Sequence, residues 1–478
     1  MNTKQLRQKI LDLAIRGKLV PQDPNDEPAS VLLERIKAEK EQLIKEGKIK
    51  RGKKSSTTSD KPHYPFDLPK GWVWSRLDEI CEIKGGKRIP RGLKLSDLPT
   101  EHVYIRVTDM KNNTVDIGDL KYITDEIYQQ IKNYTISSED LYITIAGTIG
   151  RVGTVPLQLN NANLTENAAK LTNIKCVRKY LMFALLSDIA QEHFTSKFHQ
   201  VAQPKLSIET ASKTLIPVPP IKEQRRIVNA VEQIFDIIFE LDSSIDELSK
   251  SITQCKAKIL ELAISGKIVP QDPADEPAEE LLRRINPAAV PADKSHYRQL
   301  PNGWCCCRLG DLMDFQSGLS YTKHDIMPTG IRIIRGGNVK DGRILLMEDD
   351  VFISTSLQNE ASEIKKGDII MVASTGSETL IGKTGFADGN YPNSYIGAFL
   401  RIIRPKTNVM PQFINLIMNS AQFKKHIRKE AKGSNINNVK KSTVIDFIVP
   451  LPPYNEQCRI VEAIESINRR IDDIAEVL

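Results

Sequence analysis

The 478-residue sequence has no hydrophobic run long enough to cross a membrane, and its first residues, MNTKQLRQKI, lack the apolar core of a signal peptide. We therefore expect a cytoplasmic protein with no membrane partner. Apolar residues make up 40% of the chain and charged residues 27%, which is typical of a soluble globular protein. The length allows about three domains.

Cysteine is sparse, and its spacing fits no metal site. Three of the seven cysteines are adjacent, at Cys305, Cys306 and Cys307, but no CxxC pair has a second pair or histidines to match it. Neighbouring side chains in a strand point to opposite faces, so three adjacent cysteines cannot easily chelate one metal. We expect reduced, mostly buried thiols, and neither a metal nor a cofactor in this chain.

Catalytic signatures are missing as well. The loops IGRVG (149–153) and IGKTG (381–385) are neither Rossmann nor Walker phosphate loops. PPY at 452–454 is similar to part of the NPPY box of amino-methyltransferases, but Leu451 stands where that box requires Asn or Asp. The net charge of +7 is compatible with nucleic-acid binding and is only a weak indication of it. The sequence predicts a non-catalytic protein.

The chain contains an internal duplication. Residues 7–36 and 256–285 are identical at 21 of 30 positions, at an offset of 249. LPKGWVWSRLDEI at 68–80 matches LPNGWCCCRLGDL at 300–312, and IPVPPIKEQRRIVNAVEQI at 216–234 matches VPLPPYNEQCRIVEAIESI at 449–467. The third match uses an offset of 233, so the C-terminus followed by the N-terminus rebuilds the central segment with about four residues missing.

Apolar residues at alternating spacings of four and three predict a long coiled-coil helix from 221 to about 262. Pro219 and Pro220 prevent an earlier start, and Gly266 and Pro270 end it. The same spacing continues in both terminal segments. The predicted seam comprises Leu6, Ile10, Leu13, Ile227, Val231, Ile234, Ile238, Leu241, Ile245, Leu248, Ile252, Ile259, Leu262, Ile460, Ile464, Ile467, Ile471 and Ile474.

The predicted fold class is α+β. Two mixed α/β domains are joined by two long helices, one continuous and one split across the termini, which pair as an antiparallel coiled coil with pseudo-twofold, circular organisation. The alternative is that the helices pack on their own domains or on another chain. The expected segments are a helical segment 1–47, a basic and Ser/Thr-rich linker 48–62, a domain 63–220, a long-helix region 221–290, a domain 291–452 and a C-terminal helix 453–478.

Basic and amide residues in loops are candidates for DNA contact, because Arg suits guanine edges, Asn and Gln suit adenine edges, and Lys suits phosphates. The glycine-rich loops at 149–153 and 381–385 are either DNA-contact loops or plain turns between strands. In the first domain the candidates are Lys84, Lys87, Arg88, Arg91, Arg106, Thr108, Arg151, Lys197, His199, Gln200, Gln203 and Lys205. In the second they are Arg335, Asn338, Lys340, Ser374, Thr375, Lys383, Asn435, Asn437, Asn438, Lys440 and Lys441.

Two divergent domains alternating with two near-identical helices, and the repeated PP…EQ hinge, resemble the specificity (S) subunit of type I restriction–modification systems. The resemblance implies that each domain is a target-recognition domain for half of a bipartite, asymmetric site in double-stranded DNA. It implies that the helices set the half-site spacing and dock two methyltransferase subunits, which motor–nuclease subunits then join. S-adenosylmethionine, ATP and Mg are expected on those partners and not on this chain.

Two other functions remain open on the sequence. In the first alternative, the chain is a coiled-coil scaffold without a DNA role. In the second, it is a self-sufficient methyltransferase or nuclease with unfamiliar motifs.

Overall fold

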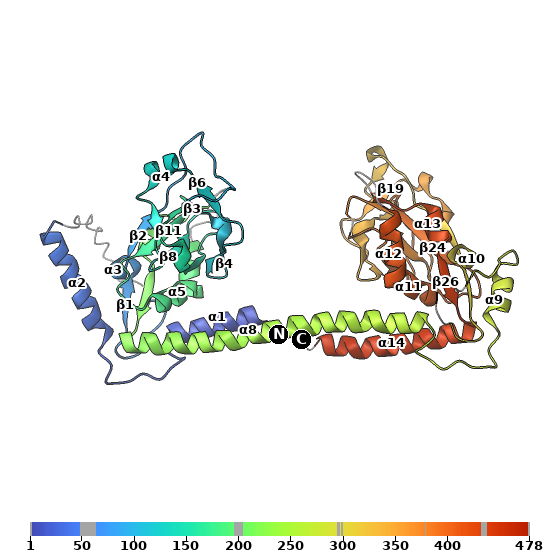
Figure 1. Ribbon diagram of the computed structural model, residues 1–478, viewed down its shortest axis with the longest axis horizontal. Coiled ribbons are helices and arrows are strands. Elements are labelled where there is room, and N and C mark those ends of the chain that lie inside the picture. The colour runs from blue at the N-terminus through green and yellow to red at the C-terminus, as the bar shows by residue number, and fades with distance from the viewer. Residues whose placement is uncertain are drawn as a thin grey trace. The chain divides into compact units, whose positions relative to one another are not determined.

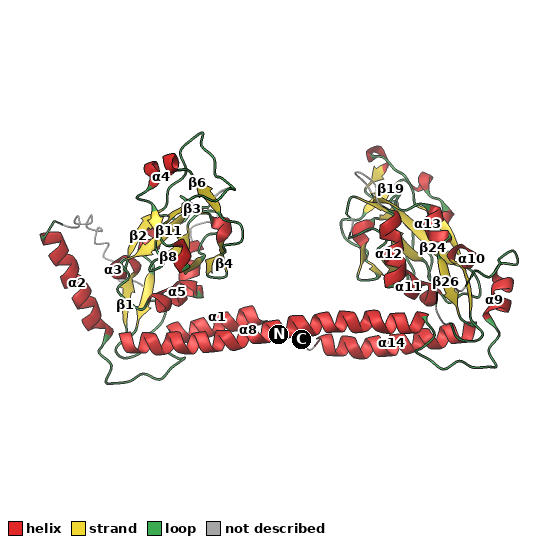
Figure 2. Ribbon diagram, in the orientation of Figure 1, coloured by secondary structure: helices red, strands yellow, loops and turns green. Residues whose placement is uncertain are grey.

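The computed structural model describes residues 2–47, 64–195, 204–293, 297, 300–377, 379–431 and 437–476. The chain divides into two compact units, Met1–Ser244 and Ile245–Leu478. Each unit combines helices with small β-sheets (Figure 1, Figure 2), which confirms the predicted mixture of helix and sheet. The predicted linker 48–62 lies outside the described residues.

The helix α8 (Ile221–Ile264) is 44 residues long and contributes its first part to one unit and its second part to the other. It begins directly after Pro219 and Pro220, as predicted. It ends where Gly266 adopts a φ of +70°, a conformation that favours glycine, and the Lys267 N–H donates to the Leu262 carbonyl at 2.9 Å. Local sequence signals therefore set both ends of this helix.

In the first unit, α1 (Thr3–Ile15) runs antiparallel to the first part of α8. Arg7 forms an ion pair of 2.8 Å with Asp242, and Gln22, just beyond α1, bonds to Glu223 at the start of α8. Low residue numbers on one helix thus meet high numbers on the other, which confirms the predicted antiparallel pairing in this unit.

The second unit repeats the arrangement. Helix α14 (Tyr454–Glu476) lies against the second part of α8, and Lys256 is ion-paired with Asp472. Gln271 bonds to Glu456 at 2.9 Å. The two terminal helices therefore each pair with a part of α8, in the way that the offsets of the duplication predicted.

The predicted seam is buried only along part of its length. Ile227, Val231 and Ile238 are buried in the first unit, and Ile460 and Ile464 in the second. Other predicted seam residues are exposed, namely Leu6 at 37%, Leu248 at 40% and Ile474 at 56% of their surface.

The buried residues of α1 are Leu11, Ala14 and Ile15, because this helix packs against α5 (Arg178–Leu186) as well as α8. The apolar face of α1 is therefore wider than the face that would contact a single partner helix in a coiled coil.

The first unit contains two four-stranded sheets and two strand pairs. Strands β3 and β10 are parallel and the other pairs are antiparallel. The first sheet has the order β6 (Lys121–Ile123), β3 (His102–Ile105), β10 (Ala162–Leu164), β7 (Thr135–Ile136). The second has β2 (Glu82–Gly85), β11 (Ala168–Thr172), β8 (Leu141–Thr144), β9 (Val152–Thr154). The pairs are β1 (Val73–Arg76) with β12 (Leu215–Val218) and β4 (Met110–Lys111) with β5 (Thr114–Val115).

The second unit has a related order of strands, in which the larger sheet continues through two further strands and the smaller sheet has its fourth strand at the opposite edge. Its larger sheet comprises β14 (Met313–Ser317), β24 (Leu400–Pro405), β20 (Ile369–Val372), β22 (Thr384–Phe386), β18 (Arg343–Ile344) and β17 (Val339–Lys340). Its smaller sheet comprises β15 (Ile326–Met327), β19 (Val351–Ile353), β16 (Ile331–Ile334) and β23 (Ser394–Ile396). The pairs are β13 (Cys305–Arg308) with β26 (Ile448–Leu451) and β21 (Ser374–Thr375) with β25 (Asn437–Asn438).

Each unit also contains shorter helices. In the first they are α2 (Ala29–Lys45), α3 (Leu77–Ile80), α4 (Asp125–Ile131), α6 (Asp188–Thr195) and α7 (Ile208–Ser212), in addition to α5. In the second they are α9 (Ala278–Ile285), α10 (Leu309–Leu312), α11 (Pro411–Asn419), α12 (Ala421–Glu430) and α13 (Lys441–Ile445). The adjacent cysteines of β13 are fully buried thiols, whereas Cys255 on α8 is exposed.

Candidate nucleic-acid interface

A buried glutamate joins each domain to its helix pair. The carboxylate of Glu223 accepts a hydrogen bond of 3.0 Å from the indole nitrogen of Trp72 and another of 3.0 Å from Gln22. Glu456 accepts the corresponding bonds from Trp304 and Gln271, both at 2.9 Å. Burial raises the pKa of the Glu223 carboxyl above its ordinary value, and the bonds from Gln22 and Trp72 act against that rise.

The glutamine that follows each glutamate in the sequence bonds to the residue before a helix of the domain. Gln224 accepts a bond of 2.7 Å from the backbone N–H of Val177, the residue before α5, and donates one of 2.8 Å to the Pro219 carbonyl. In the second unit Gln457 accepts from Met410, the residue before α11, at 3.1 Å and donates to Pro452 at 3.0 Å. The Glu-Gln dipeptide of the predicted hinge thus connects a long helix to its domain.

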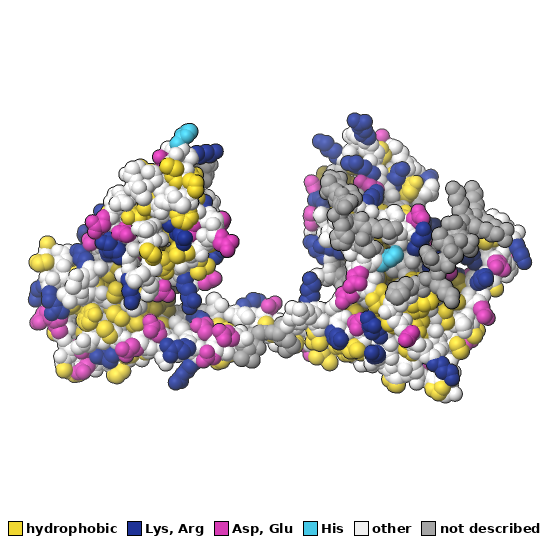
Figure 3. Space-filling view, turned by 180° about the vertical axis from the view of Figure 1, so that it is seen from behind, with side chains coloured by type: hydrophobic (Ala, Val, Ile, Leu, Met, Phe, Trp, Pro, Cys, Tyr) yellow, Lys and Arg dark blue, Asp and Glu magenta, His cyan; other side chains and the backbone are white. Residues whose placement is uncertain are grey.

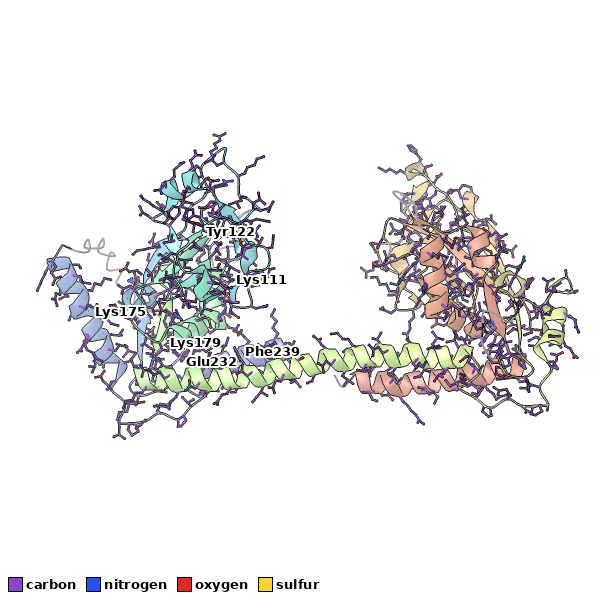
Figure 4. All side chains as sticks on the ribbon, in the orientation of Figure 1. Lys111, Tyr122, Lys175, Lys179, Glu232 and Phe239 are labelled. Carbon is purple, nitrogen blue, oxygen red and sulfur yellow. The ribbon has the colours of Figure 1, made fainter. Side chains whose placement is uncertain are left out.

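An ion pair completes this junction in each unit. Arg226 pairs with Asp26 at 2.6 Å, and Arg459 pairs with Asp275 at 2.6 Å. In the first unit Lys179 of α5 also pairs with Glu232 of α8, and Figure 4 labels both side chains at the contact between these helices. The same set of contacts therefore fixes each domain on its helices, while the loops away from the junction differ.

One cluster of candidate residues follows β2 in the first unit. A Cβ added at Gly86 would lie 2.1 Å from the Thr165 carbonyl oxygen, so only glycine allows the chain to cross at this point. Lys87, Arg88 and Arg91 lie in the exposed loop that follows this crossing. Figure 3 shows Lys and Arg side chains gathered at the end of this unit that lies farthest from its helix pair. This end can attract a phosphate backbone.

A second cluster brings together loops that are far apart in the sequence. Ala146 forms a β-bridge with Lys205 in the first unit, and Ser374–Thr375 pair with Asn437–Asn438 in the second. Both glycine-rich loops lie next to these contacts, because each connects the strand of the contact to the next strand of the sheet. The structure therefore unites the loops that we identified separately as candidates, and the exposed Lys440 and Lys441 follow them.

Some candidate side chains form hydrogen bonds within their own domain. The Arg106 guanidinium bonds to Asp109 at 2.6 and 3.1 Å and to the Asp119 carbonyl at 2.6 Å, and its side chain is 24% exposed. Thr108 bonds weakly to the same Asp109 at 3.4 Å. Arg151 donates to the Met110 carbonyl at 3.1 Å. These bonds stabilise the turn between β3 and β5. Thr108 and Arg151 are nevertheless exposed, and the contact of these residues with DNA stays a prediction.

Asn338 in the second unit also forms hydrogen bonds within its own domain. It is fully buried, accepts a bond of 2.8 Å from the Arg335 N–H and donates one of 2.9 Å to the Leu345 carbonyl. Arg335 itself is exposed and donates to the Asp349 carbonyl at 3.3 Å. Asn338 therefore stabilises its loop, and its contact with DNA stays a prediction.

The remaining candidates are exposed, half-buried or outside the described residues. Lys84 is exposed and paired with Glu82 at 2.6 Å, Lys340 is exposed, and Lys383 is half-buried. Outside the described residues lie Lys197, His199, Gln200, Gln203 and Asn435.

One exposed residue of this region is not predicted by the sequence. Phe399 is 66% exposed and lines a pocket of about 360 Å³ together with Ser374 and Thr375. An apolar residue just before a strand gives no signal in the sequence that its side chain is exposed.

Other kinds of site are not found in the described part of the chain. No group of three or more His, Cys, Asp or Glu side chains there is placed to hold a metal ion. No helix among those residues is long and apolar enough to cross a membrane.

The fold and the repeated junctions define a duplicated protein that presents two related but different α/β domains on paired helices. A family model described as the type I restriction modification DNA specificity domain matches residues 69–249 and again residues 301–476. The chain belongs to this family and is a specificity subunit of type I restriction–modification systems. As such it is a non-catalytic component of a type I restriction enzyme.

Relatives and a solved structure agree with this assignment. The EcoAI specificity subunit of Escherichia coli is 27% identical over 97% of this chain and 88% of its own length. The EcoEI specificity subunit of Escherichia coli is 25% identical over 98% of this chain and 90% of its own. A chain from a study of complex assembly and conformational transition of the type I R-M system superposes with a TM-score of 0.60 and 20% identity, covering 86% of this chain and 94% of that one. The last similarity concerns the fold alone.

Proposed function

We propose that each unit reads one half of a bipartite DNA site through the loops grouped around β8–β9 in the first domain and β20–β22 in the second. The observation that carries this proposal is the duplicated junction, which holds two domains of the same fold but with different loop residues. Because the loops differ, the two half-sites differ in sequence. Lys and Arg supply attraction to phosphates that does not depend on sequence, and loop side chains discriminate bases.

The long helices are proposed to determine the distance between the half-sites and to dock two methyltransferase subunits, which motor–nuclease subunits then join. Ile237 and Phe239 on α8 support a protein-docking role, because they are 64% and 70% exposed. Residues two positions apart point to different sides of a helix, so these are two separate exposed apolar side chains, each of which a protein partner can cover. S-adenosylmethionine, ATP and Mg belong to the partner subunits in this proposal.

Mapping of adenine methylation in cells that express this chain with its methyltransferase partner tests the proposal. We expect one motif with two different half-sites and a fixed spacer, and no such motif when the methyltransferase is expressed alone. Methylation without a bipartite motif would contradict the proposed reading of DNA.

The purified chain tests the absence of catalysis. With DNA and either S-adenosylmethionine or magnesium, we expect neither methylation nor cleavage. Turnover by the chain alone would show that it is an enzyme in its own right.

A further inference from the structure

Asn167 and Phe399 occupy the same backbone position in the two domains. The Asn167 carbonyl accepts bonds from the N–H groups of Ile145 at 2.8 Å and Ala146 at 3.2 Å. The Phe399 carbonyl accepts bonds from Ala373 at 3.0 Å and Ser374 at 3.1 Å. Each residue directly precedes the strand, β11 or β24, that pairs with the strand leading into the glycine-rich loop. The backbone is thus the same, and only the side chain differs.

Among the described residues, neither side chain forms a hydrogen bond or ion pair that stabilises its own domain. Phe399 is 66% exposed, which is unusual for an aromatic residue beside the central strand of a sheet. The side-chain amide of Asn167 makes no hydrogen bond to another residue in the described part of the chain, and the residue is half-buried. The Phe399 side chain is therefore open to a ligand, and that of Asn167 is partly exposed.

The surroundings of Phe399 combine an apolar surface with basic residues. Its pocket also includes Leu380, which is 42% exposed, and the backbone of Gly336 and Gly337. Glycine allows another molecule to approach the backbone closely.

Basic residues flank the segments that form this pocket. Arg335 precedes Gly336, and the Val372 N–H bonds to the Lys383 carbonyl at 2.9 Å. The Val439 N–H bonds to the Ala373 carbonyl at 2.8 Å, which brings Lys440 next to the same strand. An apolar pocket with a basic border suits the edge of a base pair between two phosphate backbones.

We propose that this position determines one base of each half-site, with Phe399 packing against the 5-methyl group of a thymine and Asn167 hydrogen-bonding to an adenine. The inference rests on the proposed function and goes further by assigning a specificity-determining residue to each domain. Thymine carries the only methyl group in the major groove, where Phe is a suitable partner, and Asn matches the donor and acceptor of adenine.

Methylation mapping of single variants tests the assignment. We expect F399A and F399N to lose the preference for thymine at one position of one half-site and to leave the other half-site unchanged. N167A should lose the preference for adenine at one position of the opposite half-site. V290A, at a residue that is 78% exposed and outside both domains' loops, is the matched control and should keep the wild-type motif.

The outcomes separate this inference from the proposed function. If wild-type chain gives no bipartite motif, the proposed function fails. If wild-type gives one and neither F399A nor N167A alters it, the proposed function stands and the base assignment is wrong.

A binding measurement decides the assignment even if a variant abolishes methylation. Complexes of the full chain with its methyltransferase partner are titrated with a duplex that carries the mapped motif, in which each thymine is replaced in turn by uracil. We expect one replacement to weaken wild-type binding about fourfold, which corresponds to about 0.8 kcal/mol for one buried methyl group, and to have no effect on F399A. Equal wild-type affinity for thymine and uracil at every position would overturn the methyl contact.

Discussion

The indole nitrogen of Trp72 donates a hydrogen bond of 3.0 Å to the carboxylate of Glu223, which is 1% exposed. The second unit contains the same pair at 2.9 Å, between Trp304 and Glu456. A buried carboxylate needs such donors, because it has lost its contacts with water. This bond connects the residue just before the first strand of each domain, β1 or β13, to the first turn of a long helix, α8 or α14.

The substitution Trp72→Phe should destabilise the first unit by about 1–3 kcal/mol. Phenylalanine retains the aromatic ring but leaves one oxygen of Glu223 without a donor in a buried position. Urea unfolding of the full chain measures the loss, and Trp74→Phe provides a comparison in which no bond to Glu223 is removed. An unchanged unfolding midpoint for Trp72→Phe would show that the bond contributes little.

The raised pKa of Glu223 predicts a pH dependence of stability. Because burial raises the pKa in the folded state above the unfolded value, the folded protein binds the proton more tightly. The contribution of this group is fully present below its unfolded pKa, about 4.5, and is lost as the pH rises through the folded value.

Glu223→Gln removes this titration. We expect the difference in unfolding free energy between wild-type and variant to change across that window, with wild-type losing stability relative to the variant as the pH rises. Parallel pH profiles for the two proteins would contradict the assignment.

The bonds to the junction aspartate differ between the two units, and this difference predicts a stabilising substitution. Asn455 donates a bond of 3.1 Å to Asp275 Oδ1, whereas Lys222 occupies the equivalent place in the first unit and Asp26 Oδ1 is buried without a partner. Lys222→Asn should supply that donor and stabilise the first unit by about 1 kcal/mol.

The reverse substitution is its matched control. Asn455→Lys should destabilise the second unit by a similar amount, and thermal unfolding of both variants measures the effects. Changes of the same sign in both variants would rule out this explanation.

A seven-residue insertion in α8 between Leu248 and Ser249 tests the role of the helices in spacing. One heptad preserves the phase of the apolar seam and adds about 10 Å, which is about three base pairs of DNA. We expect methylation mapping to show unchanged half-sites with a longer spacer, or no methylation. Full activity with the original spacer would exclude the helix as the element that determines spacing.

The sequence predicts the helices better than the loops, for a physical reason. Pro220 and Gly266 act on the backbone near their own positions, so the ends of α8 could be predicted without knowledge of the fold. The hydrogen bonds of Arg106, by contrast, include one to the carbonyl of Asp119. Asp119 lies thirteen residues later in the sequence and comes close to Arg106 only after the turn has folded.

The exposure of individual side chains is equally a property of the folded chain. Asn338 and Lys440 are both polar loop residues in the sequence, but one is fully buried and the other exposed. Phe399 shows the opposite case, because its apolar character suggests burial and the fold places it at the surface. Residue type alone therefore does not indicate which of these side chains are exposed.

The main chain alone anchors the position shared by Asn167 and Phe399, since the bonds to Ala146 and Ser374 are made by carbonyl oxygens and backbone N–H groups. Any side chain at this position leaves those bonds intact. A single codon change there can therefore give a descendant protein a new preference without loss of folding stability, so natural variation should accumulate at this position sooner than at the glutamate and glutamine of the junction.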